Sequence, residues 1–445
     1  MKKIRKYVIA TIILFSCFVG YKLLACFVPD AAVRNNVQKS INYMMDEGLY
    51  PSVYSYAEYH LYSQQMDNYS DAIFLNVVYN MGQTNKIEAL ACDYEGYTGE
   101  ETNEVEKTYY VVNGDGRYAL QSYARQWFGT AATLRILLSI FDYQQIRVLS
   151  QYAMYILLVL TVLIMEKRLG WKPALIYGIA IMTTSIDVVA ASANLAGAYY
   201  CTLIGSILVM VLPQRQRVLG IYIIGACTAY FDLFSIPFLT LITCVIALLL
   251  EYSENRLLTL KDEIFYSIKV GLSWLTGYLV LWLSKWLLAS IVSGTNVFKD
   301  AFEEMLKQSV NKGIDWGPTT TVEYVIESMK LCMGSIFPVN YGVMFVQKTG
   351  GVGGILILLI VLLVIGAFVR KLMKGKVEAK MFIILGLWAI IPYLLYAVMH
   401  THAFVHFWMW YRIQVITTFC LGTMFVIKRP NFSHDLVNNR GEHNE

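Results

Sequence analysis

The chain has 445 residues, of which 57% are apolar and 15% are charged, and its mean hydropathy is +0.49. A typical soluble domain has about 25% charged residues, so this composition excludes a disordered chain and a soluble enzyme with an ordinary surface. The 36 Lys and Arg exceed the 32 Asp and Glu by only four, which excludes a basic surface that follows nucleic-acid phosphates. We therefore predict an all-α polytopic membrane protein that binds a lipid bilayer and no nucleic acid.

Apolar runs long enough to cross a bilayer recur along the chain. We predict about ten spans: 7–28, 146–165, 174–190, 195–212, 218–231, 234–250, 264–292, 351–369, 381–399 and 404–427. Asp232 and Pro237 interrupt the run at 218–250, which predicts a tight hairpin of two short helices. The first run also resembles a signal peptide, but Lys22 lies where such a peptide needs apolar residues, so we expect an uncleaved span.

Basic residues give these spans an orientation, because cytoplasmic loops are enriched in Lys and Arg. They precede the first span and then recur on every second connection: Lys2, Lys3, Arg5, Lys6; Lys167, Arg168, Lys172; Arg215, Arg217; Arg256, Lys261; Arg370, Lys371, Lys374, Lys376, Lys380; Lys428, Arg429. We expect both termini to be cytoplasmic, in a bacterial-type plasma membrane.

This topology divides the chain into six parts. The predicted parts are the first span (1–28), a large extracytoplasmic segment (29–145), spans two to seven (146–292), a second extracytoplasmic segment (293–350), spans eight to ten (351–427) and a cytoplasmic tail (428–445). A connection of more than 100 residues is unlikely to lack structure, so we expect both outer segments to fold.

The first outer segment is predicted to be mostly helical over 33–80. Tyr109–Val112 is a candidate strand before an Asn-Gly turn. Tyr118–Phe141 is apolar but interrupted by arginines, which favours an amphipathic helix at the membrane interface. In the second outer segment, 297–310 and 321–336 are predicted helices that pack on the first segment as a lid. Cys92 and Cys332 alone lie in these polar stretches, so the sequence leaves one disulfide open.

Asp67 and Asp71 are the acidic pair that the sequence singles out. Four residues apart, they share one face of a helix, where two like charges repel. A metal, a cation or a nucleophile in need of a base would explain the pair. The alternatives are a solvated helix face or a helix N-cap formed by Asp67 or Ser70.

His402, His406 and Arg412 form a second group, at the outer mouth of the last two predicted spans. Charged groups inside a span usually face the bundle or a wet cavity. The two histidines could bind zinc, although no third ligand is evident nearby, or they could hold a phosphate together with Arg412. The remaining alternative is a pair of interfacial histidines beside an aromatic belt.

Asp187 and Asp232 are further acids in apolar stretches, and we expect supporting polar roles for them, with helix capping as the alternative for Asp232. By the span count these two acids, the acidic pair and the His–Arg group all map to one side of the membrane. The polar machinery is therefore predicted to face outward. The sequence contains no phosphate-binding P-loop, no dinucleotide fingerprint and no visible transporter repeat.

One span followed by a large acidic outer loop and many irregular spans resembles the GT-C glycosyltransferases. Segments 67–71, 123–129, 231–237 and 402–412 also resemble those of polytopic proteins from Gram-positive bacteria. In GT-C enzymes an acidic residue of the first outer loop acts as base or holds a metal, and cationic residues bind the lipid phosphate. The family's acidic pair is often adjacent and close behind the first span, where this chain has Asp30 and Asp46-Glu47 instead.

The resemblance implies transfer of a sugar from a polyprenyl-phosphate donor to a cell-envelope glycan or teichoic-acid-type acceptor. It makes Asp67 or Asp71 the base or metal holder, with Mg²⁺ or Mn²⁺ as the cation that such a site would take. The residues it implies for the donor phosphate are Arg125, Arg135, His402, His406 and Arg412. A polysaccharide polymerase or ligase, and a flippase or transporter without enzymatic activity, remain the alternatives.

Overall fold

Helices form nearly all regular structure in the computed structural model, which describes residues 2–53, 62–99, 102–114, 116–254, 259–309, 317–349, 351–356, 359, 370 and 379–427. Six helical segments are long and apolar enough to cross a membrane: Ile4–Cys26, Tyr143–Leu169, Ala193–Val211, Pro237–Glu254, Leu260–Ser293 and Ala379–Val398. They belong to α1 (Lys2–Cys26), α7 (Tyr143–Leu169), α10 (Ala193–Val211), η2 (Pro237–Leu241) with α12 (Ile242–Glu254), α13 (Leu260–Ser293) and α18 (Ala379–Val398).

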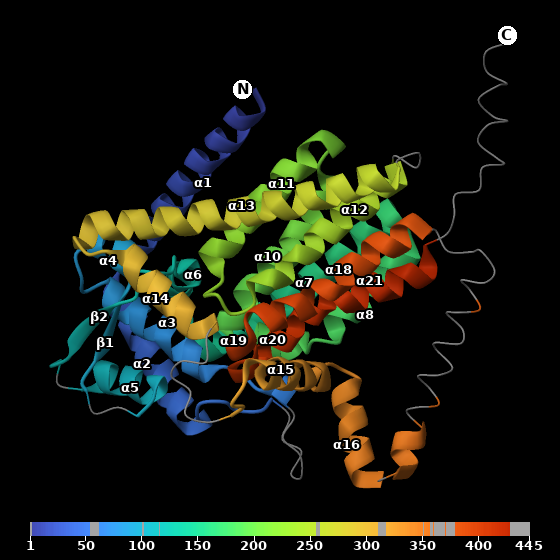
Figure 1. Cartoon of the computed structure of the whole chain (residues 1–445). Helices are drawn as coiled ribbons and strands as arrows, with labels where there is room; N and C mark the ends of the chain where they lie inside the picture. Colours follow the sequence, from blue (N-terminus) through green and yellow to red (C-terminus); the bar gives the residue numbers. More distant parts are fainter. Residues whose placement is uncertain are drawn as a thin grey trace.

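A seventh candidate span is broken. α15 (Thr321–Ser335) and α16 (Val339–Thr349) pass the same test as a pair but meet at an angle of 92°. In Figure 1, α15 lies across the bundle and α16 turns away from it. The shorter helices that complete the bundle are α8 (Trp171–Met182), α9 (Ile186–Ala190), α11 (Gln214–Phe231), α19 (His400–Val405), α20 (Phe407–Trp410), η3 (Tyr411–Gln414) and α21 (Val415–Val426).

The span predictions are confirmed in part. The runs 7–28, 146–165, 195–212, 234–250, 264–292 and 381–399 coincide with the six candidate spans, and the predicted break at Asp232 and Pro237 separates α11 from η2. The runs 174–190 and 404–427 are not continuous helices, because the backbone of Ser185 is left-handed and His406 ends α19. Most of 351–369 and the whole of 428–445 lie outside the described residues.

Local sequence accounts for the ends of the longest helices. Asp142 accepts from the backbone of Gln145 in a capping box that starts α7, and Thr259 does the same with Asp262 at the start of α13. α11 and α13 pack backbone to backbone because both carry glycine at the crossing. A Cβ on Gly225 would lie 2.1 Å from the carbonyl oxygen of Trp274, so only glycine fits there.

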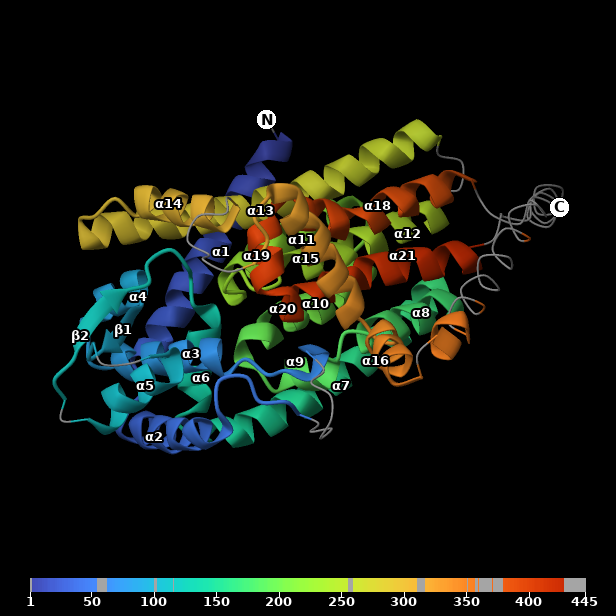
Figure 2. The ribbon, with the colours of Figure 1, turned by 60° about the horizontal axis from the view of Figure 1, so that its bottom comes forward.

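The chain between α1 and α7 folds into a helical unit at one end of the bundle. We call it the α2–α6 unit; it contains α2 (Asp30–Glu47), η1 (Tyr62–Gln64), α3 (Asn68–Met81), α4 (Lys86–Cys92), β1 (Tyr94–Tyr97), α5 (Glu104–Asn113), β2 (Ala119–Ser122) and α6 (Gly129–Leu137). The strands pair antiparallel, with Tyr94 opposite Ser122. Figure 2 shows this blue and teal unit beside α13 and α14 (Val297–Ser309), at the end of the bundle away from α8.

Two local predictions in this unit were wrong. Tyr109–Val112 lies in α5, not in a strand, because Asn103 caps the helix and Val105, Thr108 and Val111 bury one helical face. The predicted amphipathic helix over 118–141 is replaced by β2, a loop and α6, which starts only after the left-handed Phe128.

The prediction of helix over 33–80 holds for α2 and α3 but not for 48–53 and 65–67 of the connection between them, and 54–61 lie outside the described residues. Cys92 and Cys332 are both buried and free, so the open disulfide does not form. The second polar segment does contact the first: Arg125 pairs with Asp300 of α14, and the amide of Asn340 in α16 donates to Ser63.

Candidate functional site

Asp67 and Asp71 come together with α10 at the junction between the α2–α6 unit and the bundle. Asp67 is the N-cap of α3, since its Oδ1 accepts from the backbone N–H of Ser70 at 3.1 Å. Its Oδ2 accepts from the side-chain amide of Asn194 at 2.7 Å. The N-cap alternative for Asp67 is therefore confirmed, and the same carboxylate also joins α3 to α10.

Asp71 holds the start of α10 and of α7. Its Oδ1 accepts from the backbone N–H of Asn194 at 2.9 Å and from the Ser192 hydroxyl at 3.1 Å, while Oδ2 accepts from the Tyr143 hydroxyl at 2.6 Å. The Tyr143 oxygen in turn accepts from the N–H of Ala193. Asp71 thus places a carboxylate at the N-terminus of α10, where the helix dipole favours negative charge.

Both carboxylates are buried, with Asp67 at 1% and Asp71 at 0% exposure. Burial, and then the neighbouring charge of Asp67, raise the pKa of Asp71 to about 7. Burial also raises the pKa of Asp67, against the hydrogen bonds from Ser70 and Asn194 and the charge of Arg412. An acid with a pKa near 7 can accept a proton from a reacting group at neutral pH.

Arg147 provides a cation next to this pair. Its Nη1 donates to both carboxylate oxygens of Glu47, at 3.0 and 2.8 Å, and its Nη2 donates to the Asn68 side-chain oxygen at 2.5 Å. Its Nε is buried and has no hydrogen-bond partner within the described part of the chain, and the residue as a whole is 8% exposed. One N–H of this guanidinium therefore lacks a protein acceptor.

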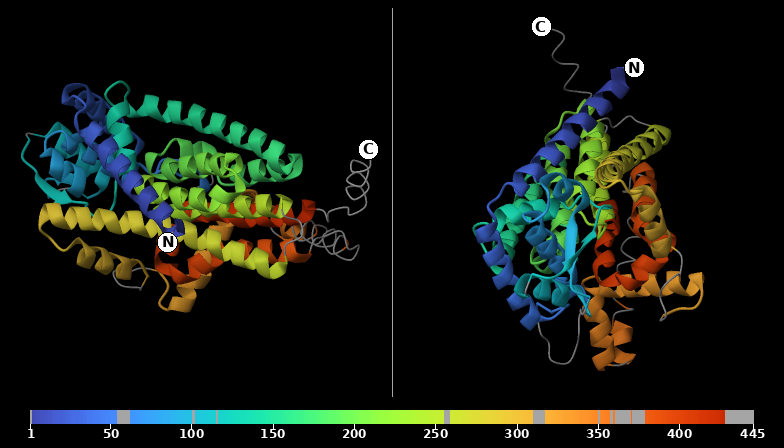
Figure 3. Two further views of the ribbon diagram at one scale, coloured as in Figure 1. Left: turned by 90° about the horizontal axis from the view of Figure 1, so that it is seen from above. Right: turned by 90° about the vertical axis from the view of Figure 1, so that its left-hand side faces the viewer.

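A cavity of about 610 Å³ opens beside Arg147, between α1, α6, α7, α10 and α11. Its wall is almost entirely apolar, and Tyr143, Arg147 and Ser150 are among its few polar residues. Figure 3, from above, shows α7 running along the side of the bundle with α1 crossing near its start. On α10 the lining runs from Ala193 to Leu208, about 22 Å of helix, so the cavity extends from the polar junction along the span.

The arginines predicted to bind phosphate are mostly engaged by the protein. Arg135 donates to the carbonyls of Ala25, Val28 and Val78 and pairs with Asp30, and it is 0% exposed. These contacts fix α6 to the end of α1. The predicted role of Arg135 has no geometric support, because its donors are used by backbone oxygens.

Arg412 and Arg125 lie in different places. Arg412 is buried and donates to the carbonyls of Thr184, Trp408 and Ser63, close enough to Asp67 to favour its ionised form. Arg125 pairs with Asp300 at 3.0 Å and is partly exposed. The structure therefore brings Arg412 to the acidic pair but leaves Arg125 on the surface beside α14.

His402 and His406 contact each other, with ring centroids 4.5 Å apart, and His402 also contacts Trp410 at 4.8 Å. Burial, and then His406, lower the pKa of His402 well below its usual range, so it is neutral at pH 7. No group of three or more His, Cys, Asp or Glu among the residues that the structure describes forms a metal site. The histidines lie in an aromatic setting, which does not favour zinc.

The acidic pair does not fit a divalent cation either. Each of the four oxygens of Asp67 and Asp71 already accepts a hydrogen bond from a protein N–H or O–H. Mg²⁺ needs near-octahedral oxygen ligands, and a cation at these carboxylates would compete with the hydrogen bonds that they already accept.

The two supporting acids are also placed. Asp232 follows α11, and its Oδ1 accepts from the N–H of Ile236 at 3.2 Å, so the capping alternative describes its contact. Burial raises the pKa of Asp232 to about 7. Ser235, three residues on, donates to the Asn194 side-chain oxygen, which ties this turn to the acidic pair. Asp187 lies in the first turn of α9 and is half-buried.

Sequence reasoning missed Arg147 and a buried ionic triad, Lys22–Asp93–Lys285. The Lys285 ammonium lies 2.7 Å from Asp93, Lys22 pairs with the same carboxylate, and all three side chains are 0% exposed. Sequence features could have identified both. Arg147 lies at the outer end of a predicted span, where the positive-inside rule expects no cation. Lys22 and Lys285 lie inside predicted spans, where charged residues are rare.

The helices and their composition define an all-α protein of a lipid bilayer, with six to seven candidate spans among the described residues. Comparison with protein-family models, curated proteins and solved structures finds no match in any of the three.

Proposed function

We propose that this protein is a membrane glycosyltransferase of the GT-C type, which moves a sugar from a polyprenyl-phosphate donor to a cell-envelope glycan or teichoic-acid-type acceptor. The observation that carries the proposal is the apolar cavity of about 610 Å³ that ends at Arg147 and Tyr143, beside the buried Asp71. A long apolar cavity with a cation at one end suits a lipid that carries a phosphate.

The isoprenoid tail of the donor lies along α10, between Ala193 and Leu208, and the cavity opens laterally to the acyl chains of the bilayer. Ala193 and Ala196 are small residues in this wall, so that a chain can lie close to the α10 backbone. The donor phosphate lies at Arg147, whose unpartnered Nε–H donates to it without breaking the pair with Glu47.

The reaction needs a base for the acceptor hydroxyl and a stabilised leaving group. The acceptor oxygen attacks the anomeric carbon, the bond from that carbon to the phosphate oxygen breaks, and the lipid phosphate leaves with the electron pair. The acceptor proton passes to Asp71 through the hydroxyl of Tyr143, a residue that lines the cavity and whose hydroxyl donates to Asp71 at 2.6 Å. A positioned general base contributes roughly 10²–10⁴-fold.

The proposal includes the topology of ten spans with cytoplasmic termini in a bacterial plasma membrane. The α2–α6 unit is then extracytoplasmic, and the acidic pair, Arg147 and the cavity mouth all lie near the outer face. Clustering of the polar groups at one end of the bundle favours a transferase over a transporter, which needs polar groups near the midplane.

The test compares deletion strains of the source organism that carry the wild-type gene, Asp71→Asn or Asp67→Asn at matched membrane expression. Asp46→Asn is the control, because Asp46 is an exposed carboxylate next to Glu47 on α2. The readout is mass spectrometry of polyprenyl-linked sugars and envelope glycans.

We expect Asp71→Asn to lack one sugar substituent and to accumulate its lipid-linked donor, while Asp46→Asn matches the wild type. Accumulation of a lipid pyrophosphate donor instead identifies a polymerase or ligase. Unchanged glycans and lipid-linked sugars in the Asp71→Asn strain exclude the transferase and bring the flippase or transporter forward.

A further inference from the structure

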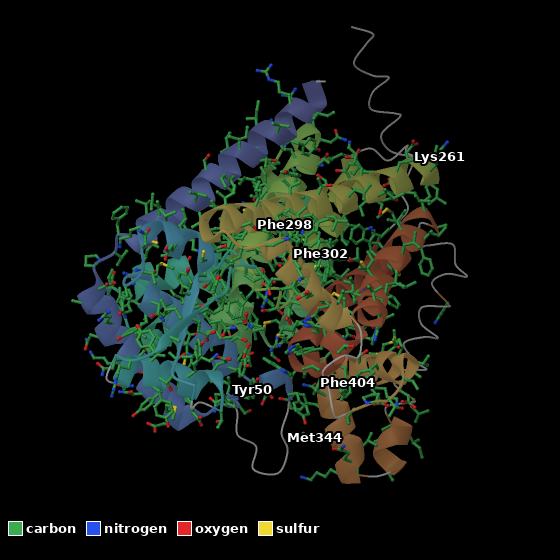
Figure 4. All side chains as sticks on the ribbon, turned by 60° about the vertical axis from the view of Figure 1, so that its left-hand side comes forward. Tyr50, Lys261, Phe298, Phe302, Met344 and Phe404 are labelled. Atoms are coloured by element: carbon green, nitrogen blue, oxygen red, sulfur yellow. The ribbon has the colours of Figure 1, made fainter. Side chains whose placement is uncertain are left out.

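Three aromatic rings from different parts of the chain meet near Asp67. Tyr50 follows α2, Tyr69 lies in the first turn of α3 and Trp408 lies in α20; we call them the aromatic platform. Tyr50 and Tyr69 are nearly parallel, at 11° with centroids 6.2 Å apart, and Trp408 meets Tyr50 edge-on at 5.6 Å. Figure 4 places Tyr50 at the surface where the α2–α6 unit meets the C-terminal helices.

The platform exposes the ring of Tyr50 to solvent and holds it between two other aromatic rings. Tyr50 is 40% exposed, whereas Trp408 is 7% exposed. The parallel Tyr69 and the buried Trp408 therefore fix the plane of the Tyr50 ring, and part of that ring remains accessible to solvent. Rings held in this way offer contact area at little cost in side-chain entropy.

Polar groups border the platform on the side of α5. The Tyr69 hydroxyl donates to Glu104 Oε1 at 3.4 Å, and Lys107 lies 2.5 Å from Glu104 and 3.5 Å from Glu95. Burial, and then the charge of Glu104, raise the pKa of Glu95 to about 8. The Glu104–Lys107 pair is neutral as a whole, and the border offers both hydrogen-bond donors and acceptors.

The platform is close to the acidic pair. Burial, and then the Asp67 carboxylate, raise the pKa of Tyr50. Burial, and then Glu104, raise the pKa of Tyr69 to about 12, and Asp67 adds a smaller contribution. A glycan bound on the platform would therefore lie near the Asp67 carboxylate.

We propose that the aromatic platform binds a neutral pyranose of a glycan, with the C–H face of the sugar stacked on Tyr50 and its hydroxyls bonded to Glu104 and Lys107. A flat aromatic surface beside a few polar groups suits a ligand with one apolar face and a polar edge. The role of this glycan as acceptor rests on the proposed transferase function, but its binding does not.

The test measures binding of the full-length protein in nanodiscs to an array of neutral hexose and N-acetylhexosamine oligosaccharides. The variants are Tyr50→Ala, which removes the stacking ring, and Tyr50→Phe, which keeps it. Tyr110→Ala is the matched control, because Tyr110 lies in the same unit and is 45% exposed. Asp71→Asn is included to separate binding from transfer.

We expect the wild type to bind at least one neutral glycan, and Tyr50→Ala to weaken that binding at least tenfold. Tyr50→Phe, Tyr110→Ala and Asp71→Asn should stay within twofold of the wild type. Absence of any bound neutral glycan, or wild-type binding by Tyr50→Ala, overturns the proposal. Intact glycan binding with weaker partition of Tyr50→Ala into liposomes also overturns it, and makes the platform an aromatic membrane anchor.

The two proposals fail separately. Glycan binding that depends on Tyr50, with unchanged envelope glycans in the Asp71→Asn strain, supports the platform and excludes the transferase. A lost sugar substituent in that strain, without glycan binding by the purified wild type, supports the transferase and overturns the platform.

Discussion

Removal of Asp93 should destabilise the protein more than removal of either lysine that it pairs with. Asp93, in a left-handed conformation after α4, accepts from Lys22 of α1 and from Lys285 of α13. Lys22 also donates to the Trp127 carbonyl and Lys285 to the Ala91 carbonyl. The triad joins two lysines to one carboxylate, so it fastens two spans to the α2–α6 unit around a single acidic group.

The magnitude follows from this charge count. Asp93→Asn leaves two ammonium groups buried at 0% exposure without an anion, and an uncompensated buried charge costs about 3–5 kcal/mol. Lys22→Met leaves Lys285 and Asp93 as a balanced pair and should cost much less. Since 1 kcal/mol shifts Tm by about 2 °C in larger chains, we expect a fall of roughly 6–10 °C for Asp93→Asn.

The assay is thermal unfolding in detergent with a thiol-reactive dye. The chain suits it, because six of its eight free cysteines are buried. Glu88→Gln, an exposed carboxylate in α4, is the control and should match the wild type. A Tm of Asp93→Asn equal to or above that of Lys22→Met would refute the charge argument, and the triad would then be energetically neutral.

Three further predictions address the site and the bundle. The Tm of Asp71→Asn should rise relative to that of the wild type as pH increases from 5 to 8.5. Folding raises the pKa of Asp71 from 3.8 to about 7, so its ionisation destabilises the wild type by up to roughly 4 kcal/mol. A difference in Tm between the two proteins that does not change with pH would contradict this. Arg135→Met should lower Tm at every pH, since it leaves the carbonyls of Ala25, Val28 and Val78 without their donor; unchanged unfolding would deny Arg135 a structural role. Gly225→Val should abolish folded protein in size-exclusion chromatography, whereas Gly20→Val, where a Cβ meets nothing within 4 Å, should not.

Hydropathy predicts the bundle well because a bilayer selects for long apolar helices and little else. The same reasoning fails where a helix is broken by local backbone geometry. Ser185 adopts a left-handed conformation between α8 and α9, and no glycine or proline marks that break in the sequence. Periodicity also misassigned 118–141, because Trp127 and Phe128 are apolar for tertiary packing and not for an amphipathic face.

The site was predicted through its acids and not through its cation. Asp67 and Asp71 could be found because their spacing on one helix is a local feature. Their partners Asn194 and Tyr143 lie on other helices, so no spacing rule connects them. Sequence also does not reveal that the donors of Arg135 and Arg412 are used by backbone carbonyls. A buried arginine in a membrane protein is as readily a structural brace as a ligand.

The most direct test of the account is native mass spectrometry of the lipid that copurifies with the protein from its own membrane. The comparison is between the wild type and Ala196→Trp, which fills the cavity beside Gly197. The account predicts a polyprenyl-phosphate-linked sugar on the wild type and its loss from Ala196→Trp. Ordinary phospholipids alone on both proteins would contradict it.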